Sequence, residues 1–164
     1  RGQRLNERMT SSSVLRVLVL LLLAVSAGCR TLPSLPPADF SAPGWRVQQG
    51  QAVWKPRQHR PELAGELLFA TDAGGNFVVQ FSKTPFPVAM ARVAGASWQI
   101  DFGSGERTWR RRGEPPARFV WFQLPRALTG ETLADDWQFT RAENNSWRLD
   151  NSRTGESLEG EFFP

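Results

Sequence analysis

Apolar and polar residues alternate along much of the chain, and a period of two is typical of β-strands with one dry and one wet face. Trp98, Ile100 and Phe102 fall on one face of such a segment, whereas Gln99 and Asp101 fall on the other. Similar short segments recur along the rest of the chain. The pattern predicts strands at 45–54, 64–71, 77–82, 88–94, 97–102, 107–112, 137–142, 147–151 and 157–162.

Turn residues separate several of these segments. Residues 72–76, 103–105 and 143–146 place glycine or asparagine where tight hairpin turns need a positive φ. The sequence therefore predicts a mostly β fold, built as an antiparallel meander, sandwich or barrel. The period of two leaves open whether the dry face is packed shut or encloses a cavity.

One stretch, Pro115–Gly130, departs from this period. Prolines suit the first turn of a helix, and the strongly apolar residues that follow end at a glycine. We expect one short helix across the open side of the sheet, kinked or ended at Pro125. The alternative is another strand followed by a loop.

An apolar run also precedes the predicted strands. Residues 17–25 are all apolar, which fits the core of a secretion signal and is too short to span a bilayer. The run leads into Ser26-Ala27-Gly28-Cys29, which resembles the lipobox of bacterial lipoproteins, whose cysteine is acylated (palmitate) and becomes the first mature residue. Cleavage by an ordinary signal peptidase, or a buried structural or catalytic Cys29, are the alternatives.

These features predict how the chain is organised. Residues 1–28 are an upstream extension plus a lipoprotein signal peptide that starts at Met9. Residues 29–44 comprise the lipidated cysteine and a proline-rich, extended tether that spaces the domain from the membrane. Residues 45–164 are long enough for one β-domain with a single core.

Composition gives little support to nucleic-acid binding and favours an apolar interior. Removal of residues 1–28 takes away four arginines against one glutamate, so the basic balance of the whole chain argues only weakly for nucleic acid. The chain has 7 Trp, 11 Phe and no Tyr, and these rings supply large apolar area without a phenolic hydroxyl. The interior should therefore be wide and apolar.

No catalytic constellation emerges, and we expect neither an enzyme nor a metal or other cofactor. His59 lies in a polar loop, Asp135 and Asp136 fit a solvated turn, and Gly103 with Gly105 fits a hairpin rather than a phosphate loop. Envelope enzyme chemistry is therefore the weakest of the readings.

Two surface features remain. Arg110–Arg112, with Arg107 and Arg118 nearby, form either an anion-binding patch for a lipid headgroup or acidic protein, or a solvated strand end. Phe86 stands between Pro85 and Pro87. Because proline supplies no ladder donor, composition favours Phe86 staying out of the ladder and folding inward rather than projecting outward.

The order of lipobox, tether, tryptophan strand, hairpins, helix and final strands resembles the LolB lipoprotein-localisation factors and, more distantly, their periplasmic relatives LolA. The likeness rests on residues 77–86, an apolar strand ending in a turn, and on 119–130, an apolar stretch ending in leucine and glycine. The resemblance implies a mostly β (α+β) fold, an unclosed antiparallel half-barrel of about eight or nine strands with one short helix as lid.

The same resemblance implies a function and its residues. Acyl chains of other lipoproteins would enter an apolar cavity, handed over by a periplasmic LolA-like carrier, while the turn Pro85–Pro87 with Phe86 at its tip would touch membrane. Arg30, where an aspartate would favour inner-membrane retention, implies an outer-membrane location facing the periplasm. We expect the protein to be a monomer. The cavity lining would comprise Trp98, Ile100, Phe102, Trp121, Leu124 and Leu128. The alternative is a structural or interaction lipoprotein whose β-core is solid.

Overall fold

The computed structural model describes residues 32–103, 105, 107–142 and 145–164. Residues 34–164 form one compact unit, so the end of the predicted tether belongs to the same unit as the strands. The predicted start at Met9, the apolar run 17–25 and the predicted lipidation site Cys29 lie outside the described residues.

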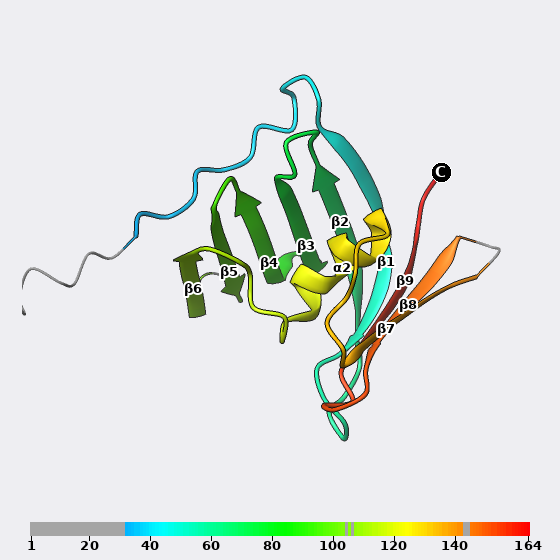
Figure 1. Cartoon of the computed structure of the whole chain (residues 1–164). Coiled ribbons are helices and arrows are strands. Elements are labelled where there is room, and N and C mark those ends of the chain that lie inside the picture. The colour runs from blue at the N-terminus through cyan, green and yellow to red at the C-terminus, as the bar shows by residue number, and fades with distance from the viewer. Residues whose placement is uncertain (1–31, 104, 106, 143–144) are drawn as a thin grey trace, which may run out of the picture. The chain divides into compact units, whose positions relative to one another are not determined.

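Nine antiparallel strands form one sheet in the order β6-β5-β4-β3-β2-β1-β9-β8-β7 (Figure 1). The edge strands β6 and β7 lie at opposite ends of this order, so the sheet is unclosed. The strands are β1 (Arg46–Lys55), β2 (Leu63–Thr71), β3 (Phe77–Lys83), β4 (Phe86–Ala94), β5 (Ser97–Phe102), β6 (Arg107–Arg112), β7 (Trp137–Arg141), β8 (Ser146–Asn151) and β9 (Ser157–Phe162). The predicted mostly β, unclosed antiparallel fold is confirmed.

The β3–β4 turn departs from the prediction. Phe86 pairs with Lys83 and begins β4, although we expected it to stay out of the ladder. A register shift between Phe81 and Ser82 lets the two strands continue to this tight turn. Because the prolines flank Phe86 at the very end of the strand, their missing N–H groups interrupt little of the ladder.

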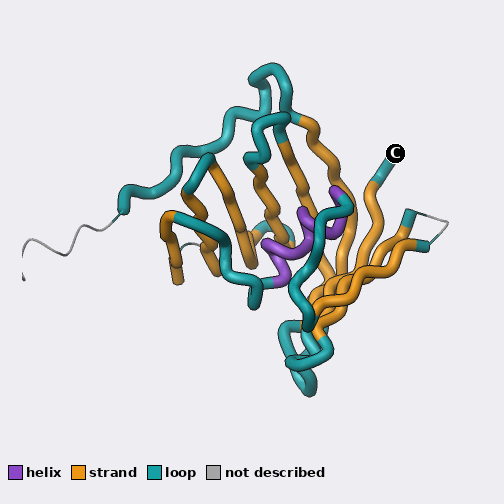
Figure 2. Tube along the Cα trace, viewed as in Figure 1, coloured by secondary structure: helices purple, strands orange, loops and turns teal. Residues whose placement is uncertain are grey.

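The helix α2 (Val120–Thr129) lies across one face of the sheet (Figures 1 and 2). It begins later than predicted, because Phe119 keeps an extended backbone. It also continues past Pro125 to Thr129, so the helix does not end at this proline. Pro125 is buried and removes only one backbone donor. Gly130 ends the helix in a left-handed conformation, with Glu131 N–H donating to the Arg126 carbonyl at 2.8 Å.

The core lies between α2 and the sheet. The register places Phe69, Val79, Ala91 and Ile100 side by side on the face toward the helix. The alternating residues, among them Gln99, lie on the opposite face, which we call the outer face. The strand period therefore predicted correctly which residues share a face, because successive side chains of a strand alternate.

Candidate functional site

The residues predicted to line an acyl cavity all belong to the helix side of the sheet. Ile100, Trp121 and Leu124 are fully buried, and Trp98 is 6% exposed. Phe102 and Leu128 are half-buried and pack against the same core. The structure thus brings all the predicted lining residues into one apolar cluster.

The interior of this cluster is occupied by the protein's own rings. Trp121 of α2 lies 5.0 Å from Trp54 and 5.4 Å from Phe81, measured between ring centroids. Trp98 meets Phe122 of the helix at 5.5 Å. Such offset and edge-to-face pairs add stability beyond their buried area. In this state the helix is therefore closed onto the sheet.

Some polar atoms in the cluster stand out. The indole N–H groups of Trp98, Trp121 and Trp147 are buried and have no hydrogen-bond partner among the described residues. Trp137, by contrast, donates its indole N–H to the Ala117 carbonyl at 2.8 Å. Buried donors are usually satisfied, so these indoles mark the part of the interior where polar partners are fewest.

A pocket of about 350 Å³ opens between α2 and strands β2, β3 and β4, and we call it the helix–sheet pocket. Its apolar wall continues the core outward, and its volume falls within the range of small-molecule sites. The residues that line it are Phe69, Thr71, Asp72, Ala73, Gly75, Phe77, Val93, Pro115, Phe122, Gln123, Pro125, Arg126, Thr129 and Glu131.

The rim of the helix–sheet pocket is polar. Arg126 forms ion pairs with Glu114 at 3.0 Å and with Glu131 at 3.7 Å. On the other side, the Asp72 carboxylate accepts hydrogen bonds from Asn76, which hold the pKa of Asp72 below its ordinary value. An apolar interior with a polar rim suits a molecule that has an apolar tail and a polar head.

The predicted membrane-contact turn projects from the domain. Phe86 is 67% exposed, so the expectation from composition that it folds inward is wrong. Pro85 is exposed and Pro87 half-buried beside it, and the Thr84 hydroxyl donates to Glu66 Oε1 at 2.9 Å. The turn holds Phe86 outward because the first pair of the hairpin, Lys83 with Phe86, lies beyond the core.

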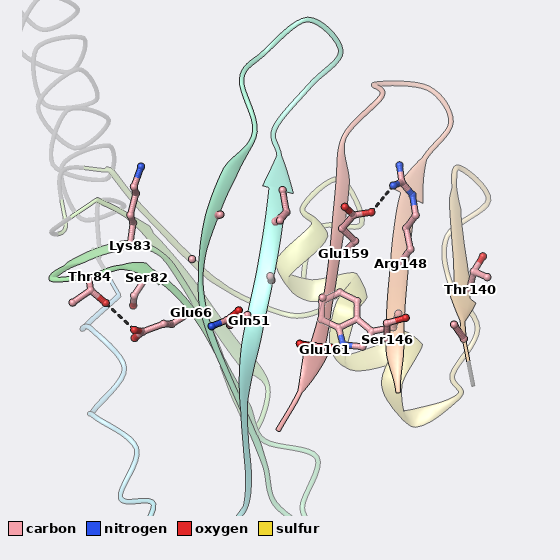
Figure 3. A pocket seen from close by; sticks show the side chains of 17 residues that line it. Gln51, Glu66, Ser82, Lys83, Thr84, Thr140, Ser146, Arg148, Glu159 and Glu161 are labelled. Atoms are coloured by element: carbon pink, nitrogen blue, oxygen red, sulfur yellow. Dashed lines mark hydrogen bonds and ion pairs between the residues drawn. The ribbon is translucent and has the colours of Figure 1, made fainter. Parts of the chain in front are cut away.

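A larger groove of about 750 Å³ lies on the outer face (Figure 3), with α2 behind the strands. The labelled side chains come mostly from β1, β2, β8 and β9, and the register places Gln51, Glu66, Glu159 and Glu161 on one face. Arg148 bridges Glu159 and Asp150 within it, which raises the pKa of Arg148. Both signs of charge line this groove, as they do the helix–sheet pocket, but the helix–sheet pocket alone lies between α2 and the sheet, next to the aromatic core.

One titratable group connects the outer loops to the core. The Trp54 indole N–H donates to Glu156 Oε1 at 2.9 Å. Burial raises the pKa of Glu156 to about 7, although the bond from Trp54 and the charge of Arg57 act in the opposite direction. Glu156 was not anticipated from the sequence. Trp54 is 102 positions away along the chain, and nothing in the local pattern around Glu156 indicates that the two side chains are in contact.

The other residues considered as catalytic or phosphate-binding candidates do not form a common site among the described residues. His59 is exposed in the β1–β2 loop with a φ of 64°, and Asp136 pairs with Arg153 at 2.7 Å. Gly103 has a φ of 64° in the β5–β6 turn, where part of the predicted hairpin lies outside the described residues. Within residues 32–164, apart from the gaps, no three His, Cys, Asp or Glu side chains are placed to hold a metal ion.

The arginines of the predicted basic patch lie on the edge strand β6. Arg107, Arg111 and Arg112 are exposed and Arg110 is half-buried, and Arg118 stacks over the Phe119 ring at 4.8 Å. Charged side chains on an edge strand also discourage pairing with other sheets. The structure leaves both interpretations of this patch open.

No protein-family model matches the chain, and no curated protein matches its sequence. In the described part of the chain, no helix has both the length and the apolar character to cross a bilayer. The fold and the geometry of the helix–sheet pocket are therefore the observations that bear on function.

Sequence reasoning missed the apolar residues of this pocket, Phe69, Phe77, Val93 and Phe122. Each was assigned correctly to a strand or helix, but their meeting depends on which strands neighbour one another and on where α2 crosses them. The dry-face alternation of β2, β3 and β4 is the signal that could have indicated them.

Proposed function

We propose that the chain is a non-enzymatic, lipid-anchored protein of the bacterial outer membrane, facing the periplasm, that binds acyl chains between α2 and the sheet. The helix–sheet pocket is the observation that carries this proposal. It is about 350 Å³ in volume and leads from the surface toward the aromatic core. An acyl chain enters there and displaces the rings of α2 from those of the sheet.

The energetics favour such an exchange. Each CH₂ group removed from water contributes about 0.8 kcal/mol, and the rings of Trp121 and Phe122 are held by apolar ring contacts at centroid distances of 5.4 Å to Phe81 and 5.5 Å to Trp98. The burial of a long acyl chain therefore offsets the loss of these ring-to-ring contacts. The buried indole N–H groups become available to the ester or carboxyl end of a ligand when the helix moves.

The proposal includes partners and a location. Cys29 carries the lipid, and the exposed Phe86 dips into the bilayer when cargo is delivered. A periplasmic carrier of the LolA type hands over the acyl chains of lipoproteins. The closed state described above is the state between deliveries, when the apolar surface has to be hidden from water.

The test is to purify the chain with Cys29→Ser, which prevents acylation, and to analyse its organic extract for fatty acids or lipoprotein. We expect acyl chains to co-purify. Val93→Trp fills the helix–sheet pocket and should remove them, because Val93 lines it. Val47→Trp is the matched control, since Val47 is exposed on β1 away from the pocket. Equal acyl content in the two variants would contradict the proposed entry site.

A second candidate function is docking to an envelope complex through the outer face. The observation that favours it is the 750 Å³ groove with its mixed charges, combined with a core that is closed by its own rings. This alternative predicts that no acyl chain co-purifies with any variant. It also predicts that reversing a groove charge, as in Glu161→Lys, abolishes capture of an envelope protein.

A further inference from the structure

The end of the tether is hydrogen-bonded to the outer face of the sheet. Gln99 Oε1 accepts a hydrogen bond from the Leu35 backbone N–H at 2.9 Å and another from the Ser34 hydroxyl at 3.2 Å. Arg92 donates to the Leu35 carbonyl at 3.0 Å and to the Pro36 carbonyl at 3.3 Å. Side chains of two neighbouring strands thus bind both backbone groups of one tether residue.

A third side chain fixes the orientation of these two. Asp101 accepts hydrogen bonds from Gln99 Nε2 at 2.9 Å, from Arg92 at 3.3 Å and from the Thr108 hydroxyl at 2.7 Å. Because the Gln99 amide nitrogen faces Asp101, its oxygen faces the tether. We call Arg92, Gln99 and Asp101 the tether clamp.

The clamp is buried although it stands on the outer face. Gln99 is 3% exposed, and the side chains of Arg92 and Asp101 are 13% and 16% exposed. An outward-facing strand glutamine is ordinarily solvated. The hydrogen bonds from the tether to Gln99 are therefore shielded from water while the tether is docked.

The tether sequence suits the clamp. The two carbonyls that Arg92 binds belong to Leu35 and Pro36. Pro36 and Pro37 have no N–H groups, so an extended run past Leu35 needs no further acceptor from the sheet. Prolines also restrict the unbound chain, which reduces the conformational entropy lost on docking.

We infer that the tether clamp is a binding site for an extended, proline-rich peptide main chain, that its ligand is this chain's own segment Ser34–Pro36, and that it sets how far the domain can move from Cys29. Docked, the clamp leaves only residues 30–33 between Cys29 and the bound segment, a reach of about 17 Å. Released, the free chain extends to Arg46, a reach of about 60 Å. The statement on reach rests on the proposed anchor at Cys29, whereas the docking does not.

The docking is tested on the full chain with Cys29→Ser, purified in detergent, by measuring hydrogen exchange of the Leu35 amide with NMR. Gln99→Ala should speed this exchange roughly tenfold, because it removes the acceptor. Gln138→Ala is the matched control, since Gln138 is an exposed outer-face glutamine of β7. Leu35 exchange that is equally fast in the unsubstituted chain and in Gln99→Ala would overturn the clamp.

A second variant tests the docking without changing any residue of the sheet, so that an effect on the folding of the sheet is not mistaken for loss of docking. Leu35→Pro removes the amide donor from the tether side and leaves every strand residue in place. It should speed proteinase K cleavage within residues 38–44 as much as Gln99→Ala does, and unchanged cleavage in both variants would overturn the clamp.

The consequence for reach is measured separately, on the acylated chain in vesicles, by energy transfer from a dye at Ser152 to a membrane dye. Release by Gln99→Ala should lower the transfer. Faster Leu35 exchange with unchanged transfer would support docking and overturn the statement on reach from Cys29.

Discussion

The two faces of the sheet hold their side chains in different ways. On the helix side, rings from α2 and the strands contact one another at centroid distances such as 5.0 Å for Trp54 and Trp121, and three indole N–H groups find no partner within the described part of the chain. On the outer face, polar groups are organised in pairs and networks, as around Asp101 and Arg148. The dry face is therefore stabilised mainly by buried apolar surface and ring contacts, which another apolar molecule can partly replace, whereas the outer face is stabilised by hydrogen bonds and ion pairs between particular groups.

The largest effect on stability is expected when a ring is removed from the dry face of the sheet. Trp121→Ala removes a ring that is 1% exposed and contacts Trp54 and Phe81. We expect the free energy of unfolding to fall by about 3–5 kcal/mol, measured by urea denaturation. Trp109→Ala, on the exposed edge strand, is the matched control and should cost about 1 kcal/mol or less. Equal losses would mean that the ring cluster is not the core.

The hydrogen bond between Trp54 and Glu156 should make the free energy of unfolding depend on pH. Because the pKa of Glu156 is raised in the folded state to about 7, the folded state binds its proton more tightly than the unfolded state does. This contribution to stability is present below the unfolded pKa, near 4.5, and is lost as the pH rises through about 7. In Glu156→Gln the loss should disappear, a difference of about 2 kcal/mol between the two pH values, measured by denaturation.

The control for Glu156 is Glu161→Gln, because Glu161 is exposed in the outer groove. This variant should retain the pH dependence of the unsubstituted chain. A Glu156→Gln variant that loses stability between pH 4.5 and 7 as steeply as the unsubstituted chain would contradict a buried, protonated Glu156.

The contribution of ion pairs on the outer face to stability is tested at Arg148. Arg148 pairs with Asp150 at 2.8 Å and with Glu159 at 2.5 Å, but its side chain is half exposed. We expect Arg148→Ala to lower the free energy of unfolding by about 1 kcal/mol or less, and less at high salt. A loss comparable to that of Trp121→Ala would show that charges, rather than rings, stabilise this end of the sheet.

The smallest effect on stability is expected at the β3–β4 turn. Phe86→Glu should change the free energy of unfolding by about 0.5 kcal/mol or less, because Phe86 is mostly exposed. It should weaken vesicle binding of the Cys29→Ser chain roughly tenfold, measured by flotation. Phe163→Glu, at another exposed phenylalanine, is the matched control. Unchanged binding in Phe86→Glu would remove the turn from the proposed membrane contact.

Much of the fold could be predicted because strand patterning is local. The strand at 97–102 and the helix ending at Gly130 follow from alternation and from a glycine that permits a left-handed conformation. The error at Phe86 arose because hairpin pairing outweighed a local rule about proline. At Pro125 the helix continues to Thr129, although a proline can also end a helix. Local rules state a residue's preference, and tertiary contacts decide whether it is followed.

Neighbours along the chain were sufficient to predict most strand positions and the dry face of each strand, and they favoured a helix over a further strand within 115–130. The packing of the folded chain was needed to bring the rings of Trp54 and Trp121 together, to place the half-buried Glu156 against Trp54, and to bind the tether to Gln99. Those contacts join residues as many as 102 positions apart, and strand order, which no local pattern specifies, brings them together.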